Sequence, residues 1–283
     1  MRVLSAKKEL SDIVSSYKKE SKTIGFVPTM GALHEGHLAL VKRSIEENDR
    51  TIVSIFVNPL QFNSAKDLAK YPRVLEEDVR LLEGKGVDLV FAPSEKDLYP
   101  SKQIVTIDFG DLSEILEGKY RPDHFDGVGV IVSKLLHLTL PSKAYFGLKD
   151  LQQFILIRRM CKDLSFACQI VGVDTVRETT GLAMSSRNRQ LSDQGLKNAT
   201  VIYEGLSKMG SGIDSRKDLN ELLEATKKMY EEAEGFDLEY LEAIDPSDLS
   251  TVSTYRSLNE LAICVAGYVE GIRLIDNLYL RLK

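Results

Sequence analysis

Apolar, strand-like runs alternate with segments of helical periodicity over about the first 175 residues, and this alternation constrains the fold most strongly. Strands that are apolar throughout are buried on both faces, and strict alternation with helices predicts a parallel sheet covered by helices. The predicted strands cover residues 23–27, 51–57, 87–92, 143–146 and 167–173, and the predicted helices cover 37–47, 72–82, 130–138 and 149–163. We therefore predict an α/β fold with a doubly wound parallel sheet.

The sequence changes in character after residue 173. Two charged amphipathic helices are predicted at 192–208 and 218–234, and strand-like runs follow at 238–244, 261–269 and 273–280. This pattern predicts a second, smaller α+β domain. We place the first domain at residues 1–175 and the second at 176–283, and we expect a turn or hinge at 210–215, where the sequence reads GSGIDS.

Composition argues against several classes of function. The chain has 37 basic and 42 acidic residues, and its net charge of −5 disfavours a protein that coats nucleic acid. No apolar stretch approaches the roughly 20 residues of a membrane-spanning helix, and the sequence MRVLSAKKEL lacks the apolar core of a secretory signal. Cys161, Cys168 and Cys264 form no C-x-x-C pair, as in a reducing compartment. We expect a cytoplasmic protein with small-molecule partners, and neither a nucleic acid nor a membrane.

The loop after the first predicted strand carries the clearest chemical signal. Residues 28–37 read PTMGALHEGH and lead into a helix, whose N-terminus offers unpaired N–H groups and a positive dipole end to a phosphate. The G-x-x-x-x-G spacing matches half of a P-loop, but His37 and Leu38 stand where a P-loop has lysine and a hydroxyl residue. Two histidines at this place, His34 and His37, indicate stabilisation of charge on a phosphate, and the alternative is a pair of solvated or capping side chains.

The His34-Glu35-Gly36-His37 motif resembles the HxGH signature of the nucleotidylyltransferase superfamily. Longer stretches are similar to the pantothenate synthetase family, the pantoate–β-alanine ligases: residues 28–37, 56–62 (FVNPLQF), 71–73, 121–128 (RPDHFDGV), 146–153 (FGLKDLQQ) and 184–188 (MSSRN). The resemblance implies a Rossmann-like fold and an ATP-dependent ligase. It would condense (R)-pantoate with β-alanine through a pantoyl adenylate, release AMP and pyrophosphate, and form a homodimer.

The same resemblance implies roles for individual residues. The catalytic set, expected to gather around the triphosphate of ATP, is His34, His37, Lys149, Ser185, Ser186 and Arg187. Further ATP-binding positions are Met30, Gly31, Gly147, Asp150, Val176 and Met184. Pantoate would be held by Asn58, Gln61 and Gln153, and its dimethyl carbon would be lined by Val128, Ile131 and Val132. Mg²⁺, which enters with ATP, would be bound by Glu77 and Asp78.

Some of these residues have a plainer interpretation. Without the resemblance, Val128, Ile131 and Val132 are typical of a helix face in the core, and the acidic run 76–78 is typical of a solvated helix face. Two positions depart from the family pattern. Leu148 stands where a polar or acidic residue is commoner, and Asp123 stands where glycine is common, which argues against a close role for His124.

Two other functions remain open at this point. One is an adenylyltransferase that moves AMP onto a nucleotide or a phosphorylated acceptor. Such a site should carry additional basic residues, whereas the two glutamines and the apolar helix face favour a small acid with an uncharged body. The other is a fragment of a tRNA synthetase or an RNA-binding module, which the net charge of −5 disfavours.

Overall fold

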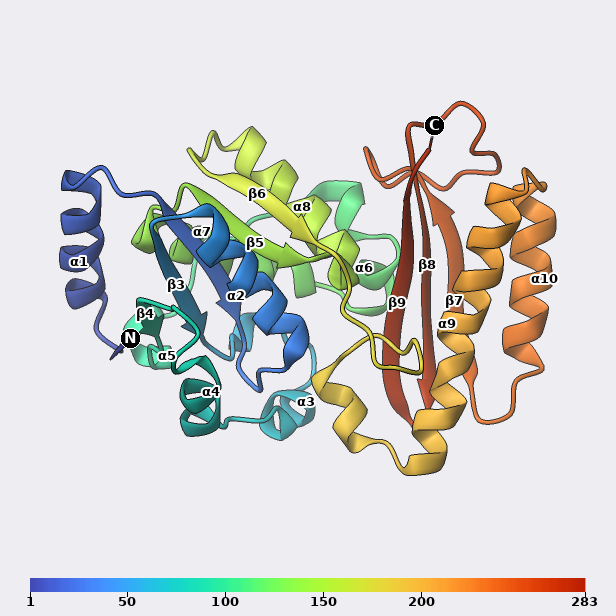
Figure 1. Cartoon of the computed structure of the whole chain (residues 1–283), viewed down its shortest axis with the longest axis horizontal. Coiled ribbons are helices and arrows are strands. Elements are labelled where there is room, and N and C mark those ends of the chain that lie inside the picture. The colour runs from blue at the N-terminus through green and yellow to red at the C-terminus, as the bar shows by residue number, and fades with distance from the viewer. Residues whose placement is uncertain (283) are drawn as a thin grey trace. The chain divides into compact units, whose positions relative to one another are not determined.

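The computed structural model describes residues 1–282 and, for residues 65–67, the backbone alone (Figure 1). The chain divides into two compact units. The first unit consists of Met1–Gly147 and Gln153–Val173, and the second consists of Leu148–Gln152 and Asp174–Lys283. The short segment 148–152 therefore belongs to the second unit, although it lies inside the predicted first domain in the sequence.

A parallel sheet forms the centre of the first unit. Among the described residues its six strands follow the order β1-β4-β3-β2-β5-β6, and every pairing is parallel. The strands are β1 (Arg2–Leu4), β2 (Ile24–Thr29), β3 (Arg50–Ile55), β4 (Leu89–Phe91), β5 (Lys143–Gly147) and β6 (Gln169–Val173). The prediction of a doubly wound parallel sheet is confirmed. Strand β1 was not predicted, because it is an edge strand of only three residues.

Helices cover this sheet and bury its apolar residues. The longer ones are α1 (Lys7–Lys19), α2 (Glu35–Glu47), α4 (Leu75–Leu82), α7 (His124–Thr139) and α8 (Leu151–Asp163). Shorter elements are the 3₁₀ turns η1 (Pro59–Gln61) and η2 (Gly110–Ser113) and the α-helices α3 (Ala65–Lys70), α5 (Glu95–Leu98) and α6 (Glu117–Tyr120). Val27 of β2 packs with Leu40 of α2 and Leu82 of α4. Phe26, the residue before Val27 in β2, is equally buried and points to the opposite face, so both faces are covered.

The strand order locates the site-forming edge of the sheet. The chain runs from β2 outward through β3 and β4 on one side and from β5 to β6 on the other, so the direction of winding changes between β2 and β5. Ligands of doubly wound sheets bind beyond the carboxyl ends of the strands at this switch point. The loop that follows Thr29 and the end of β5 at Gly147 both lie there.

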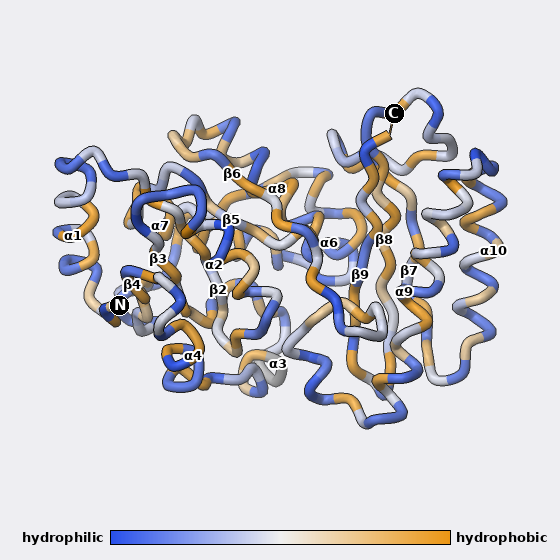
Figure 2. Tube along the Cα trace, in the orientation of Figure 1, coloured by the Kyte–Doolittle hydropathy of each residue, from blue (hydrophilic) through white to orange (hydrophobic). Residues whose placement is uncertain are grey.

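The second unit packs two helices against an antiparallel sheet. Its strands, in the order β7-β8-β9, are β7 (Asp237–Ile244), β8 (Glu260–Val269) and β9 (Ile272–Arg281). Figure 1 shows α9 (Asp193–Asp214) and α10 (Leu219–Glu231) side by side on one face, and the hydropathy colouring of Figure 2 shows β8 as largely apolar. Leu206 and Met209 of α9, Tyr230 of α10, and Ile263 and Val265 of β8 share one core. In the part of the chain described here, no helix combines the length and the apolarity needed to cross a bilayer.

The turn expected at 210–215 is wrong, because α9 continues to Asp214. The glycines suggested a helix breaker, but Gly212 has a packing role. A Cβ at this position would lie 2.3 Å from Cδ2 of Leu222, so glycine lets α9 approach α10 closely. The chain turns only after the helix, where Arg216 adopts a left-handed conformation with φ of +57°.

Candidate active site

The loop between β2 and α2 depends on backbone conformations that glycine adopts most easily. Gly31 has φ of +82° and Ala32 has φ of +51°. A Cβ on Gly31 would lie 2.8 Å from Oδ2 of Asp78, so this position requires glycine both for its conformation and for space. The tight loop brings the chain from the end of β2 to the start of α2 within a few residues.

Asp78 of α4 holds this loop in place. Its carboxylate is 3% exposed and accepts hydrogen bonds from the backbone N–H of Ala32, at 3.0 Å, and of Leu33, at 2.7 Å. Hydrogen bonds of this kind to a buried carboxylate compensate for its loss of hydration. Asp78 thus orders the loop that carries the histidines, although it lies 45 residues from Leu33 and 46 from Ala32 in the sequence.

This role does not suit the metal-binding role expected of Asp78. Both carboxylate oxygens already accept backbone N–H groups, while Glu77 is exposed on the neighbouring face of α4. Among the residues described, no group of three or more His, Cys, Asp or Glu side chains is arranged to hold a metal ion. With both oxygens of Asp78 bound to the loop, this arrangement disfavours Glu77 and Asp78 as Mg²⁺ ligands, and that role stays a prediction.

His34 and His37 are held in defined orientations at the N-terminus of α2. His34 is the N-cap, and its Nδ1 accepts from the backbone N–H of Gly36 at 3.2 Å. Nδ1 of His37 accepts from the backbone N–H of His34, also at 3.2 Å, and the two ring centroids are 4.1 Å apart. A ring nitrogen that accepts a hydrogen bond carries no proton, so the neutral rings carry theirs on Nε2. Both side chains thus act as N–H donors beside the positive end of a helix dipole.

Asn58 organises the neighbouring turn η1. The side chain is 1% exposed, and its Nδ2 donates to Oε1 of Gln61 and to the backbone oxygen of Gly127, both at 3.0 Å. Its Oδ1 accepts from the hydroxyl of Tyr99 at 2.8 Å, and burial raises the pKa of Tyr99, which keeps that donor neutral. The sequence suggested only an Asn-Pro turn. The structure shows that Asn58 fixes the side chain of Gln61.

Gln61 lies beside the loop of β2. It is 7% exposed, and its Nε2 donates to Sδ of Met30 at 3.1 Å. The structure therefore brings together Gln61, an expected pantoate-binding residue, and Met30, an expected ATP-binding residue. Gln153 is half-buried near the start of α8.

Helix α7 supports η1 through a close backbone approach. A Cβ on Gly127 would lie 2.3 Å from the backbone oxygen of Leu60, so only glycine allows the helix to pack this tightly. Nδ1 of His124 lies 2.7 Å from the backbone oxygen of Gln61. Asp123, which departs from the family pattern, has φ of +61°, a conformation that aspartate tolerates better than most residues. Val128, Ile131 and Val132 of the same helix are 3–5% exposed.

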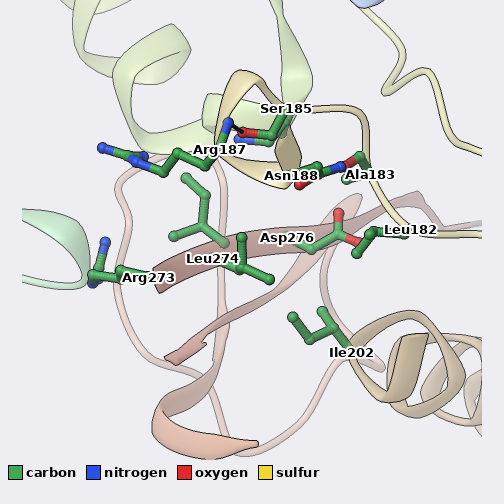
Figure 3. Close-up of a pocket in the computed structure, with 11 residues that line it drawn as sticks. Leu182, Ala183, Ser185, Arg187, Asn188, Ile202, Arg273, Leu274 and Asp276 are labelled. Carbon is green, nitrogen blue, oxygen red and sulfur yellow. Dashed lines mark hydrogen bonds between the residues drawn. The ribbon is translucent and has the colours of Figure 1, made fainter. Parts of the chain in front are cut away.

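A pocket in the second unit collects the expected cationic residues. Its lining includes Lys149, Ser185 and Arg187, and in Figure 3 the segment with Ser185 and Arg187 lies over the strand that carries Leu274 and Asp276. Ser185 caps the turn η4 (Ser186–Gln190), and its Oγ accepts from the backbone N–H of Arg187 at 3.2 Å. The side chain of Lys149 is 17% exposed, and Nζ is 3.8 Å from Oδ1 of Asp150. Segments far apart in the sequence thus line one pocket, which contains both Lys149 and Arg187.

The other expected ATP-binding residues fall in both units. Met184 precedes η4, and its backbone N–H donates to the backbone oxygen of Val176 at 3.0 Å. Gly147 ends β5 and Asp150 is exposed in η3 (Leu148–Asp150). The leucine at position 148 is compatible with this site, because the segment is held through its backbone oxygens by Nδ2 of Asn277.

Sequence reasoning missed three further polar residues of the pocket, which are Asn188, Arg273 and Asp276. Arg273 pairs with Glu239, with Nη2 at 2.5 Å from Oε2, and Asp276 pairs with Arg177. The sequence did indicate Arg273 and Asp276, because both are charged residues within the apolar run 273–280, and a strand that only fills the core carries no charged residues.

A family model described as pantoate-beta-alanine ligase matches residues 2–279. A relative named pantothenate synthetase, from Cytophaga hutchinsonii, is 44% identical over 262 residues, which cover 92% of this chain and 93% of the relative. A protein of the same name from Bacteroides thetaiotaomicron is 42% identical over 98% of both chains.

Solved structures agree with these matches. Pantothenate synthetase from Thermus thermophilus superposes with a TM-score of 0.93 at 42% identity, over 98% of this chain and 99% of that chain. The pantoate-beta-alanine ligase of Francisella tularensis, solved with beta-gamma ATP and beta-alanine, superposes with a TM-score of 0.81 at 39% identity, over 98% and 97% of the two chains.

Proposed function

The chain belongs to the pantoate–β-alanine ligase family and is an ATP-dependent ligase, and from this premise we propose that it works through a pantoyl adenylate. In the first half-reaction a carboxylate oxygen of (R)-pantoate attacks the α-phosphorus of ATP. The bond from that phosphorus to the bridging oxygen breaks, and pyrophosphate leaves. In the second half-reaction the amine of β-alanine attacks the acyl carbon, the bond to AMP breaks, and the nitrogen loses a proton to give pantothenate.

His34 and His37 stabilise the charge that develops on the phosphates. Their Nδ1 atoms accept backbone N–H groups, so each ring presents Nε2–H as a donor whose orientation is fixed before ATP binds. Donors that are already oriented need no reorganisation as charge builds up, and this is the main way in which proteins accelerate phosphoryl transfer. No side-chain nucleophile takes part, because bound reactants and an activated acyl group are sufficient.

Lys149 and Arg187 are the cations that we assign to the triphosphate. Lys149 offers a compact charge and Arg187 offers a planar fork that spans two phosphate oxygens. Ser185 and Ser186 contribute hydroxyl groups at the start of η4. The carboxylate and the hydroxyls of pantoate are bound by Gln61 and Gln153, whose amides hydrogen-bond without bringing charge into the site. Val128, Ile131 and Val132 line the side where the dimethyl carbon lies.

Magnesium enters as the ion that accompanies ATP. Mg²⁺ retains several waters and binds mainly to substrate phosphates in such sites, so it requires few protein ligands. Because Asp78 is engaged with Ala32 and Leu33, we assign no step to an ion held by the protein.

The observation that supports this function most directly is the histidine pair at the start of α2, with both Nδ1 atoms engaged and Nε2–H as donor. The test is a single-turnover experiment with enzyme, ATP and pantoate in the absence of β-alanine. We expect pyrophosphate to be released in an amount equal to the active sites, followed by AMP and pantothenate once β-alanine is added. No pyrophosphate before β-alanine, or a stable dinucleotide product, would contradict the proposal.

We also propose that the protein acts as a homodimer in the cytoplasm. Ile104 and Val105 are 87% and 69% exposed in a segment without helix or strand, and apolar side chains this exposed favour a partner surface. Light scattering should give twice the chain mass of 31.7 kDa, and Ile104→Glu should shift it toward the monomer.

A further inference from the structure

Two adjacent residues of β9, Asp276 and Asn277, bind the two segments that carry the cations of the second unit. Asn277 is 6% exposed, and its Nδ2 donates to the backbone oxygens of Leu148, at 2.8 Å, and of Lys149, at 2.9 Å. Both protons of the amide are thus used on the short turn η3. Asn277 lies 129 residues from Leu148 and 128 residues from Lys149 in the sequence, so the contact joins distant segments.

Asp276 binds the other segment through Arg177. Its Oδ2 is 2.5 Å from Nη1 and its Oδ1 is 3.0 Å from Nη2 of Arg177, and the carboxylate is only 2% exposed. Nη1 of Arg177 also donates to the backbone oxygen of Gly181 at 3.1 Å. The backbones of Arg177 and Ala183 form an isolated antiparallel β-bridge. The loop held in this way leads directly to Ser185 and Arg187.

The two contacts are coupled within β9. Nη2 of Arg177 donates to the backbone oxygen of Asn277 at 3.3 Å, and the backbone N–H of Asn277 donates to Oδ1 of Asp276 at 2.8 Å. A bidentate arginine–carboxylate pair has a well-defined geometry, and a buried amide with both donors satisfied is equally restricted. Residues 276 and 277 therefore fix two distant pieces of chain to one point of the sheet.

We propose that Asn277 is a positioning residue, which with Asp276 sets the place of Lys149 relative to Ser185 and Arg187 and so prepares the triphosphate site. The inference rests on the proposed role of Lys149. Lys149 lies on the three-residue turn η3 (Leu148–Asp150), between the last residue of β5 and the first residue of α8, and the side chain of Asn277 binds two backbone oxygens of that turn. Displacement of a positioned group by about 1 Å can cost about 100-fold in rate.

A purely structural role and a positioning role for Asn277 predict different effects on the rates of the two half-reactions. Loss of stability lowers the amount of active enzyme, and both half-reactions then fall by the same factor. Loss of positioning lowers pyrophosphate release alone, because the second half-reaction starts from an adenylate that has already lost the β- and γ-phosphates. The ratio of the two rates is independent of the fraction of folded enzyme.

The experiment compares Asn277→Asp, Lys149→Ala and the double variant in the full chain. Asn277→Asp keeps the size of the side chain and places an oxygen against two carbonyl oxygens. Pyrophosphate release is measured with ATP and pantoate, and the second half-reaction with prepared pantoyl adenylate and β-alanine. Asn277→Ala is run in parallel in case the aspartate variant does not fold. Asn259→Asp makes the same chemical change at an exposed position of the second unit and serves as the matched control.

We expect the rate ratio to fall at least about tenfold in Asn277→Asp and about 100-fold in Lys149→Ala. The double variant should match Lys149→Ala within about twofold, because Asn277 acts through Lys149. An unchanged ratio in both Asn277 variants, or losses that multiply in the double variant, overturns the inference while the function stands. A wild-type ratio in Lys149→Ala overturns the inference together with the proposed role of Lys149.

Discussion

The imidazole Nδ1 of His37 accepts the backbone N–H of His34 at 3.2 Å, so His37 forms a capping box with His34, the N-cap residue of α2. This contact separates two roles within one side chain. Nδ1 stabilises the start of α2, and Nε2–H is the donor assigned to phosphate. Replacement of His37 by asparagine can keep the acceptor role of Nδ1 alone, and replacement by the longer glutamine can keep the donor role of Nε2 alone.

His37→Asn places an amide oxygen where Nδ1 was, and His37→Gln places an amide N–H near the position of Nε2. We expect His37→Asn to be as stable as the wild type and to lose about 10²- to 10³-fold in pyrophosphate release. His37→Gln should keep at least about tenfold more of that rate than His37→Asn and lose about 0.5–1 kcal/mol of stability, because it loses the cap. Urea unfolding and single-turnover kinetics measure the two effects. Wild-type pyrophosphate release by His37→Asn is the contradicting outcome.

Asp78→Asn tests whether the buried carboxylate orders the histidine loop. The amide oxygen can accept one N–H group, and the amide nitrogen then faces the other, so we expect a loss of about 2 kcal/mol in the free energy of unfolding. Glu77→Gln, the exposed neighbour, should change neither stability nor rate. Added Mg²⁺ should not restore the activity of Asp78→Asn, and full recovery at high Mg²⁺ would show that this carboxylate is a metal ligand after all.

Gly127→Ala should disturb the site through η1. The new Cβ would meet backbone atoms, the oxygen of Leu60 at 2.3 Å and the nitrogen of Gln61 at 2.7 Å, so Gln61 must move. We expect the KM for pantoate to rise about tenfold or more, with a much smaller effect on the KM for ATP. Gly129→Ala on the same helix meets only side chains, at 3.0–3.1 Å, and is the control. Equal effects of the two substitutions on the KM for pantoate would contradict the proposal that Gly127 acts on pantoate binding through η1 and Gln61.

Glu47 provides a pH-dependent test of the first unit. Its Oε2 accepts from Nζ of Lys143 at 2.8 Å and from the hydroxyl of Tyr145 at 3.1 Å, and the hydrogen bonds from Lys143 and Arg43 lower the pKa of Glu47 from 4.5 to about 2. A lowered pKa contributes stability above the ordinary value, and this contribution is lost as pH falls through the lowered value. Glu47→Gln should therefore cost about 1 kcal/mol at pH 7 and progressively less between about pH 4.5 and pH 2.

Urea midpoints across this pH range measure the difference for Glu47→Gln. Glu46→Gln is the control, because the pair that Glu46 forms with Lys42, at 3.9 Å, is exposed. A stability difference that stays constant down to pH 2.5 would contradict the assignment of the lowered pKa to Glu47.

The sequence predicted the architecture where local pattern determines it. Apolar runs predicted five strands of the parallel sheet, because burial on both faces is visible in the residues themselves. Apolar runs also predicted β7, β8 and β9 of the second unit. The edge strand at Arg2–Leu4 is too short to carry a pattern. The glycines at 210 and 212 misled the prediction because local sequence does not report how closely α10 approaches α9.

The candidate site was predictable where its residues are consecutive. The sequence of the loop 28–37 predicts a helix N-terminus that carries two histidines. Asp78, which orders this loop, belongs to the distant acidic run 76–78, whose sequence is typical of a solvated helix face. Asp276 and Asn277 were hidden in an apolar strand, since only the topology brings β9 next to Lys149.

Transfer of an isotope label tests the central claim, formation of a pantoyl adenylate, most directly. Pantoate labelled with ¹⁸O in its carboxylate is turned over with ATP and β-alanine, and the AMP is analysed by mass spectrometry. The proposed mechanism predicts one ¹⁸O atom in the phosphate of AMP for each pantothenate formed, since the acyl oxygen leaves with AMP. Unlabelled AMP, or ADP and phosphate as products, would contradict it.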